Sequence, residues 1–283
     1  MRSLPILTLV VVMMPAWALA GVNDNLYEGY QQLLNDYLVE QTLPGDGLVS
    51  AFDYTAALAD EQVAQTIAQQ TAVLRDFDPD SLDGREQTVA FWINAYNFFM
   101  LSEILTDRPD GKLVSSVWDY GGRVNPFVDS VFERETFVVG SEQMSLNDIE
   151  KGRLLGKSYA DRGWKDARVH FAVNCASVGC PPLRQQIYTA DNLEEMLKEN
   201  TRRAFSTPYH LKIQGDTLYV TELFKWYEQD FVDAAGSVRG FIRHWADNDT
   251  AAEVAKTSSL DYIDYDWSLN RPSNFSGSVF KRD

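Results

Sequence analysis

The sequence predicts an α+β fold in which helices pack around a small, mostly antiparallel sheet. Several stretches carry apolar residues at helical spacing, and residues 211–220 carry two short apolar runs separated by Gln-Gly-Asp, which is typical of a hairpin. Of the 283 residues, 45% are hydrophobic and 23% are charged. This ordinary globular composition excludes disordered, collagen-like and coiled-coil proteins.

The N-terminal third of the chain predicts helices joined by turns. Residues 24–40 place apolar side chains at helical spacing and predict an amphipathic helix. Gly45-Asp46-Gly47 is typical of a turn, and residues 52–75 predict a second helical stretch.

Residues 86–106 form the clearest predicted helix. Its apolar residues cover every side, so we expect it to be buried all round. Asn94 and Asn97 interrupt it three residues apart and therefore share a face. A buried amide without partners costs a few kcal/mol. The two amides therefore either fix buried loops or line a substrate pocket beside His170.

The middle of the chain predicts an irregular region over residues 107–143, followed by a capped helix. Ser145-Leu146-Asn147-Asp148 resembles a capping box in which an acid replaces the usual Glu, and the helix is expected to run to about Leu155. Glu150 lies on this helix, either as a surface acid or as a substrate-binding carboxylate facing the same pocket.

The C-terminal part predicts more helices around the hairpin. Residues 190–206 are helical, Thr221 caps a following helix, and a short helix lies near residues 238–246. Aromatic residues between 262 and 269 predict a tail that packs against the core.

The first twenty residues are typical of a secretory signal peptide. Arg2 supplies the positive charge, Ile6 to Met14 form an apolar core, and Ala18-Leu19-Ala20 fits a cleavage site. This core is shorter than the roughly 20 residues of a membrane span. We therefore expect cleavage after Ala20 and a single exported domain over residues 21–283, periplasmic or secreted, with no membrane span after cleavage.

The net charge argues against some classes of binding partner. Lys and Arg total 25 against 41 Asp and Glu, which gives a net charge of −16. No basic stripe is present, which argues against nucleic acid and anionic membranes as partners. We expect a small-molecule or peptide-like ligand.

Residues 168–180 contain most of the side chains that could take part in catalysis or bind a metal. Residues 168–173 alternate apolar and polar side chains and predict a strand that carries His170, and Asn174, Cys175 and Cys180 follow it. In an oxidising compartment the two cysteines would form a disulfide. It would close a short loop and contribute roughly 2 kcal/mol.

The same residues also fit nucleophilic catalysis. A thiolate needs a base and a group that orients the base. A straight strand would place Cys175 roughly 16 Å from His170, whereas Cys180 follows Gly179 and is free to fold back. The catalytic set would then be Cys180 as nucleophile, His170 as base and Asn174 as orienting group, with Cys175 nearby.

Metal binding is the third interpretation of this segment. His170, Cys175 and Cys180 would supply three ligands, but their spacing matches no common zinc pattern and a fourth ligand is missing. We therefore expect no metal and no other cofactor.

Five sequence blocks resemble the DUF547 family. They cover most of residues 27–270 in order: Phe91-Trp92-Ile93-Asn94-Ala95-Tyr96-Asn97; Ser145-Leu146-Asn147-Asp148-Ile149-Glu150; His170-Phe171-Ala172-Val173-Asn174-Cys175 with Cys180-Pro181-Pro182-Leu183; Leu223-Phe224-Lys225-Trp226-Tyr227 with Asp230-Phe231; and Tyr265-Asp266-Trp267-Ser268-Leu269-Asn270. The resemblance implies an exported, bacterial-type member of a family whose function is undefined. Lys151 stands where that family often has His, and Leu155 where it usually has Arg.

Two hypotheses about function follow. By analogy, the order of His before Cys fits a permuted papain-like or transglutaminase-like thiol fold. The first hypothesis is therefore a cysteine-dependent hydrolase or acyltransferase that acts on an amide or thioester in the cell envelope. The alternative is a non-catalytic binding module with a structural Cys175–Cys180 disulfide.

Overall fold

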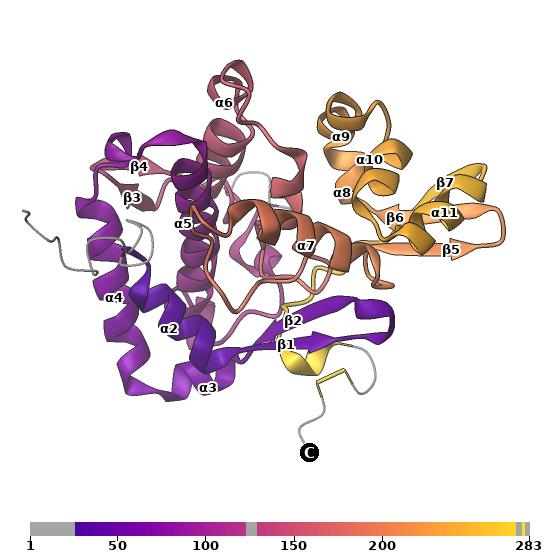
Figure 1. The fold of residues 1–283 in the computed structure, drawn as a ribbon. Helices are drawn as coiled ribbons and strands as arrows, with labels where there is room; N and C mark the ends of the chain where they lie inside the picture. Colours follow the sequence, from indigo (N-terminus) through magenta and orange to yellow (C-terminus); the bar gives the residue numbers. More distant parts are fainter. Residues whose placement is uncertain (1–25, 123–128, 276–278, 281–283) are drawn as a thin grey trace, which may run out of the picture.

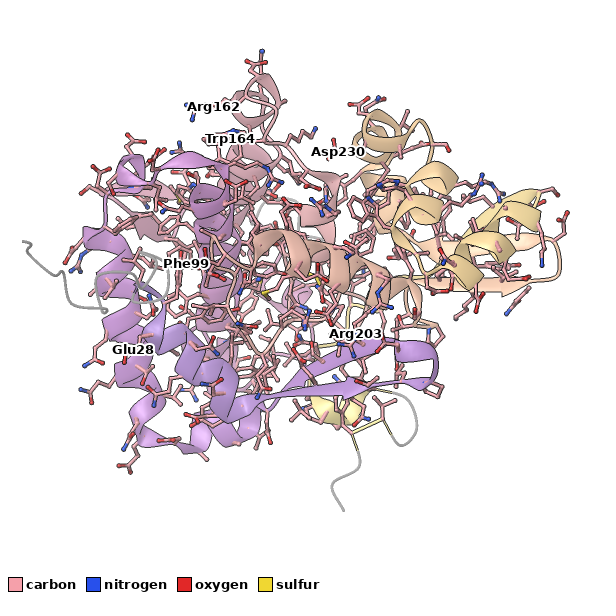
Figure 2. All side chains as sticks on the ribbon, in the orientation of Figure 1. Glu28, Phe99, Arg162, Trp164, Arg203 and Asp230 are labelled. Carbon is pink, nitrogen blue, oxygen red and sulfur yellow. A yellow bond between two sulfur atoms is a disulfide. The ribbon has the colours of Figure 1, made fainter. Side chains whose placement is uncertain are left out.

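The helix α5 (Gly84–Thr106) runs through the centre of the largest hydrophobic core among the described residues. The computed structural model describes residues 26–122, 129–275 and 279–280, so the predicted signal peptide lies outside the described residues. In α5 every residue from Val89 to Leu105 is buried, which confirms the prediction from its all-round apolar sequence. Phe99, labelled in Figure 2, is one of these interior side chains.

Shorter helices surround α5 (Figure 1). They are α2 (Glu28–Tyr37), α3 (Tyr54–Ala59), α4 (Glu61–Asp76), α6 (Lys157–Asp161) and α7 (Leu193–Phe205), with a π-helix over Asp148–Leu154 and a 3₁₀ helix over Ala167–Phe171. In the described part of the chain, no helix combines the length and the apolar character needed to cross a membrane.

The predicted helix over residues 24–40 is too long. Helix α2 ends at Tyr37, and the next residues form β1 (Leu38–Thr42), which pairs antiparallel with β2 (Leu48–Phe52). Gly45, with φ of 77°, adopts the left-handed conformation that the intervening turn requires. Strand pairing therefore overrides the helical spacing at the end of this stretch.

The α+β class is confirmed, but the strands form three small sheets rather than one. The other two sheets pair β3 (Phe137–Val139) with β4 (Glu142–Met144), and join β5 (Leu211–Gln214), β6 (Thr217–Thr221) and β7 (Ser259–Ile263). Only the β6–β7 pair is parallel among the described strands. The β5–β6 hairpin confirms the prediction for residues 211–220.

A second core lies beside the β5–β7 sheet, on one side of the molecule in Figure 1. It is built from α8 (Leu223–Trp226), α9 (Glu228–Ala235), α10 (Val238–Trp245) and α11 (Asn248–Lys256). Aromatic rings dominate it, with Phe171, Phe205, Phe224, Phe231 and Phe241 all fully buried.

The strand predicted over residues 168–173 is wrong. Ala167–Phe171 is a 3₁₀ helix that begins where the Asp166 carboxylate accepts a hydrogen bond from the Arg168 amide at 2.9 Å. The apolar alternation has a different origin: Val169 packs into the largest core, whereas Phe171 packs into the second core. The chain therefore turns after His170, and the distance expected for a straight strand does not apply.

Candidate functional site

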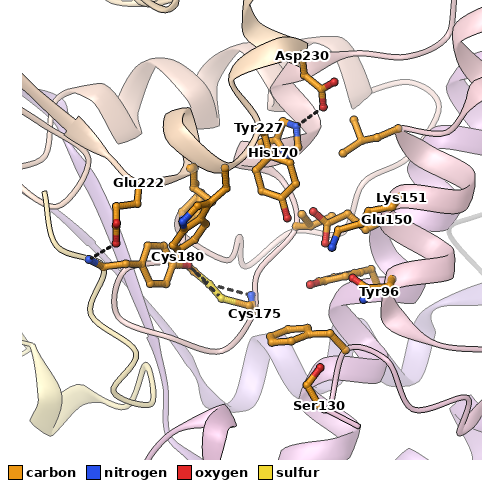
Figure 3. Close-up of a pocket in the computed structure, with 18 of the residues that line it drawn as sticks. Tyr96, Ser130, Glu150, Lys151, His170, Cys175, Cys180, Glu222, Tyr227 and Asp230 are labelled. Carbon is orange, nitrogen blue, oxygen red and sulfur yellow. Dashed lines mark hydrogen bonds and ion pairs between the residues drawn. A yellow bond between two sulfur atoms is a disulfide. The ribbon is translucent and has the colours of Figure 1, made fainter. Parts of the chain in front are cut away.

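A pocket of about 870 Å³ is lined by residues of both the α5 core and the second core, such as Tyr96 and Tyr227. Figure 3 shows that the π-helix, the 3₁₀ helix, the cysteine loop and α8–α9 all contribute side chains to it. The candidate site residues that line it are Glu150, His170, Cys175 and Cys180. The other three, Asn94, Asn97 and Asn174, do not line it.

Cys175 and Cys180 form a disulfide in the wall of this pocket. No free cysteine occurs among residues 26–122, 129–275 and 279–280. The Tyr265 hydroxyl donates to the Cys180 Sγ at 3.0 Å and lies 3.1 Å from the Cys175 Sγ. The Cys175 amide also donates to the Cys180 Sγ at 2.9 Å. The disulfide interpretation of the two cysteines is therefore confirmed, and neither sulfur is a thiolate in this state.

The cysteine loop is also held by hydrogen bonds that do not involve sulfur. The Asn174 side chain donates to the Pro181 carbonyl at 2.7 Å and accepts from the Ala176 amide at 2.9 Å. The Val178 and Gly179 amides donate to the carbonyls of residues 268 and 266. This network fixes the positions of both sulfurs relative to the C-terminal segment.

His170 pairs with a carboxylate that was not among the predicted site residues. Its Nε2 lies 2.8 Å from the Asp230 Oδ2, and its ring lies against Tyr227 with ring centroids 4.1 Å apart. Asn174 was expected to orient His170, but its amide is bound to the cysteine loop. The carboxylate that binds the His170 ring is instead that of Asp230 on α9, because the chain turns away between His170 and Asn174.

The environment of Asp230 keeps it ionised. Burial alone would raise its pKa, but hydrogen bonds from His170 and Lys165 outweigh burial, so the pKa of Asp230 lies below its usual value. The imidazole Nδ1 of His170 is buried and has no hydrogen-bond partner among the described residues. One nitrogen of the ring is thus fixed, and the other can accept or donate a hydrogen bond.

Glu150 reaches the pocket from the π-helix. The expected capping box forms, because the Ser145 hydroxyl donates to the Asp148 carboxylate at 2.6 Å and accepts from the Asp148 amide at 3.1 Å. Glu150 follows within the same turn and is only 7% exposed. π-helical turns are rare and often occur at functional sites.

Two tyrosines face the Glu150 carboxylate. Figure 3 shows the Tyr227 hydroxyl pointing toward it, with Tyr96 close by. Burial and then the neighbouring Glu150 charge raise the pKa of both tyrosines well above the usual value. Both hydroxyls therefore stay protonated at neutral pH and can donate hydrogen bonds.

Asn94 and Asn97 act on the backbone. The Asn94 amide exchanges two hydrogen bonds with the backbone of Tyr188, at 2.7 and 3.0 Å. The Asn97 amide donates to the Ala172 carbonyl at 2.9 Å and accepts from the Asn174 amide at 2.8 Å. Of the two interpretations, this geometry favours loops fixed by buried amides, and Asn97 holds both ends of the turn after His170.

Aromatic residues form a wall of the pocket that Glu150 also lines, and for those between residues 262 and 269 the sequence predicted packing against the core. The Trp226 and Trp267 rings stack with centroids 5.6 Å apart, and Tyr265 lies 4.9 Å from Trp226. Trp226 is 42% exposed, which is unusual for so large an apolar side chain. The two C-terminal blocks of the family resemblance contain these residues and were the signal that could have found them.

The described residues contain no group of three or more His, Cys, Asp and Glu side chains that could hold a metal ion. His170 is held by Asp230, and both cysteines are committed to the disulfide.

Comparison with known proteins adds one match. No curated protein and no solved structure matches the chain. The DUF547 family, described as a protein of unknown function, matches residues 79–204. This range runs from the turn before α5 to the end of α7. The match supports the family resemblance.

Proposed function

We propose that the chain is a binding module whose pocket takes a small-molecule or peptide-like ligand, with the Cys175–Cys180 disulfide as a structural part of its wall. The observation that carries this proposal is the closed disulfide itself, because it leaves the pocket without a thiolate. A volume of about 870 Å³ falls within the range of ligand pockets.

Export to an oxidising compartment is part of the proposal. Residues 1–20 predict a signal peptide, and disulfides persist in the periplasm and outside the cell. The closed bridge between Cys175 and Cys180 agrees with such a destination.

Ligand-observed NMR with a fragment library tests the binding proposal. We expect fragments that bind the wild type to lose their signal with Trp226→Ala, because Trp226 offers the exposed ring of the aromatic wall. Trp164→Ala is the matched control, since Trp164 packs on Tyr159 away from the pocket. The proposal fails if no fragment binds, or if the two variants respond alike.

A second candidate is thiol-dependent hydrolysis or acyl transfer after the bridge is reduced. The Cys175 amide and the Tyr265 hydroxyl both donate to the Cys180 sulfur, and such donors stabilise a thiolate. The His170–Asp230 pair in the same pocket would supply a base.

Ester hydrolysis measured with and without dithiothreitol tests this second candidate. We expect p-nitrophenyl acetate turnover only in the reduced protein, lost in Cys180→Ser and retained in Cys175→Ser, because Cys180 has the two donors. Equal turnover by the oxidised protein, or equal loss in both variants, would refute it.

A further inference from the structure

From the charges around the pocket we infer that Glu150 and the aromatic wall form a site for an alkylammonium group, so that the ligand is an amine with an apolar body. This inference rests on the proposed function and specifies its ligand. It begins with the four carboxylates that line the pocket: Glu133, Glu150, Glu222 and Asp230.

Two of these four carboxylates are in ion pairs, and a third, Glu133, accepts hydrogen bonds from Ser130. Asp230 is bound by Lys165 and His170. Glu222 lies 3.3 Å from the Lys225 ammonium. Hydrogen bonds from Ser130 lower the pKa of the Glu133 carboxyl, and the charge of Lys151 lowers it further.

Glu150 is the exception. It forms no ion pair with any described residue, although it is more than nine-tenths buried. The neighbours of its carboxylate include the neutral tyrosines Tyr96 and Tyr227. Lys151, the next residue, lines the same pocket but is not in an ion pair with Glu150. A buried carboxylate without a counter-ion is costly, so a cationic ligand would relieve a cost that the protein otherwise bears.

The surrounding rings suit the same kind of ligand. Tyr96, Tyr227, Tyr265, Trp226 and Trp267 all line the pocket with Glu150. Aromatic faces attract alkylammonium groups through cation–π interactions, and Trp is the strongest partner. An amine could therefore place its charge at Glu150 and its apolar body against the exposed face of Trp226.

Calorimetric titration with three probes of similar shape tests this inference: benzylamine as its ammonium ion, benzyl alcohol and benzoate. We expect benzylamine to bind at least about tenfold more tightly than benzyl alcohol, and benzoate to bind most weakly. Glu150→Gln should abolish this preference. Glu228→Gln should retain it, because Glu228 is an exposed acid outside the pocket and its loss changes the net charge equally.

The outcomes separate this inference from the proposed function. Equal binding of amine and alcohol, or a preference that survives Glu150→Gln, would overturn the ammonium site while leaving a ligand pocket. Absence of binding by all three probes at millimolar concentration would also overturn it. Fragment hits that depend on Trp226 would still support the pocket in either case.

Discussion

At the scale of single residues, buried asparagine side chains keep the pocket in shape because they form hydrogen bonds with backbone groups of the surrounding loops. Asn97 lies three turns into α5, yet it binds the carbonyl of Ala172 and the amide of Asn174 on either side of the turn after His170. Asn174 then binds the ends of the cysteine loop. The helix α5 thereby fixes the positions of His170 and both cysteines.

Asn97→Leu is therefore expected to destabilise the fold by about 1–3 kcal/mol, because two buried backbone groups lose their partners. The same range applies to Asn94→Leu. Urea unfolding measures both effects. Glu86→Leu, on the exposed first turn of the same helix, should stay within about 0.5 kcal/mol of the wild type. If the two asparagine variants are neutral, the amides do not support the loops.

Asp230 gives a prediction about pH. Its folded-state pKa is lower than its unfolded value, so its stabilising effect is present above the unfolded pKa of about 3.9 and disappears as the pH falls through the folded pKa. Asp230→Asn should cost about 1–3 kcal/mol at neutral pH, and the difference from wild type should narrow below about pH 4. Unfolding curves over this pH range measure it.

The matched control for Asp230 is Asp233→Asn, an exposed acid on the same helix. It should stay within about 0.5 kcal/mol of the wild type at every pH. A constant loss of stability in the Asp230 variant from neutral to acid pH would contradict an Asp230 carboxylate that is ionised in the folded protein.

At the scale of elements, local patterns predicted helices well and the 167–173 segment poorly. The all-round apolar sequence of α5 has one structural solution, a buried helix, and its bounds were predicted within two residues. The alternation of Val169 and Phe171 fits two structures. Both side chains can lie on one face of a strand, or each can pack into a different core. The position of the second core could not be predicted from the sequence alone.

Two glycines of the π-helix region provide an element-scale prediction. A methyl group at Gly156 would overlap the carbonyl oxygen of Gly152, whereas at Gly152 the nearest atom is 4.0 Å away. Gly156→Ala should therefore destabilise by about 1–3 kcal/mol and weaken fragment binding through displacement of Glu150. Gly152→Ala should stay within about 1 kcal/mol. Thermal unfolding distinguishes them, and equal behaviour would contradict the close approach.

At the scale of the whole molecule, the pocket depends on contacts between distant parts of the chain. Tyr265 reaches Cys180 over a separation of 85 residues, and Asp230 reaches His170 over 60 residues. Periodicity and capping residues report only on near neighbours, so the sequence indicated Glu150, His170 and the cysteines. Apart from their places in the family blocks, nothing in the sequence indicated Asp230 or the aromatic wall, because tertiary folding brings these residues to the pocket.

The central claim is that the pocket wall contains a closed Cys175–Cys180 disulfide, and a thiol count tests it most directly. Protein isolated without reductant is denatured and reacted with a maleimide reagent, with a parallel sample reduced first. We predict no labelled thiol before reduction and two afterwards, since the chain has two cysteines. Two labelled thiols without reductant would contradict the account and favour a free nucleophile at Cys180.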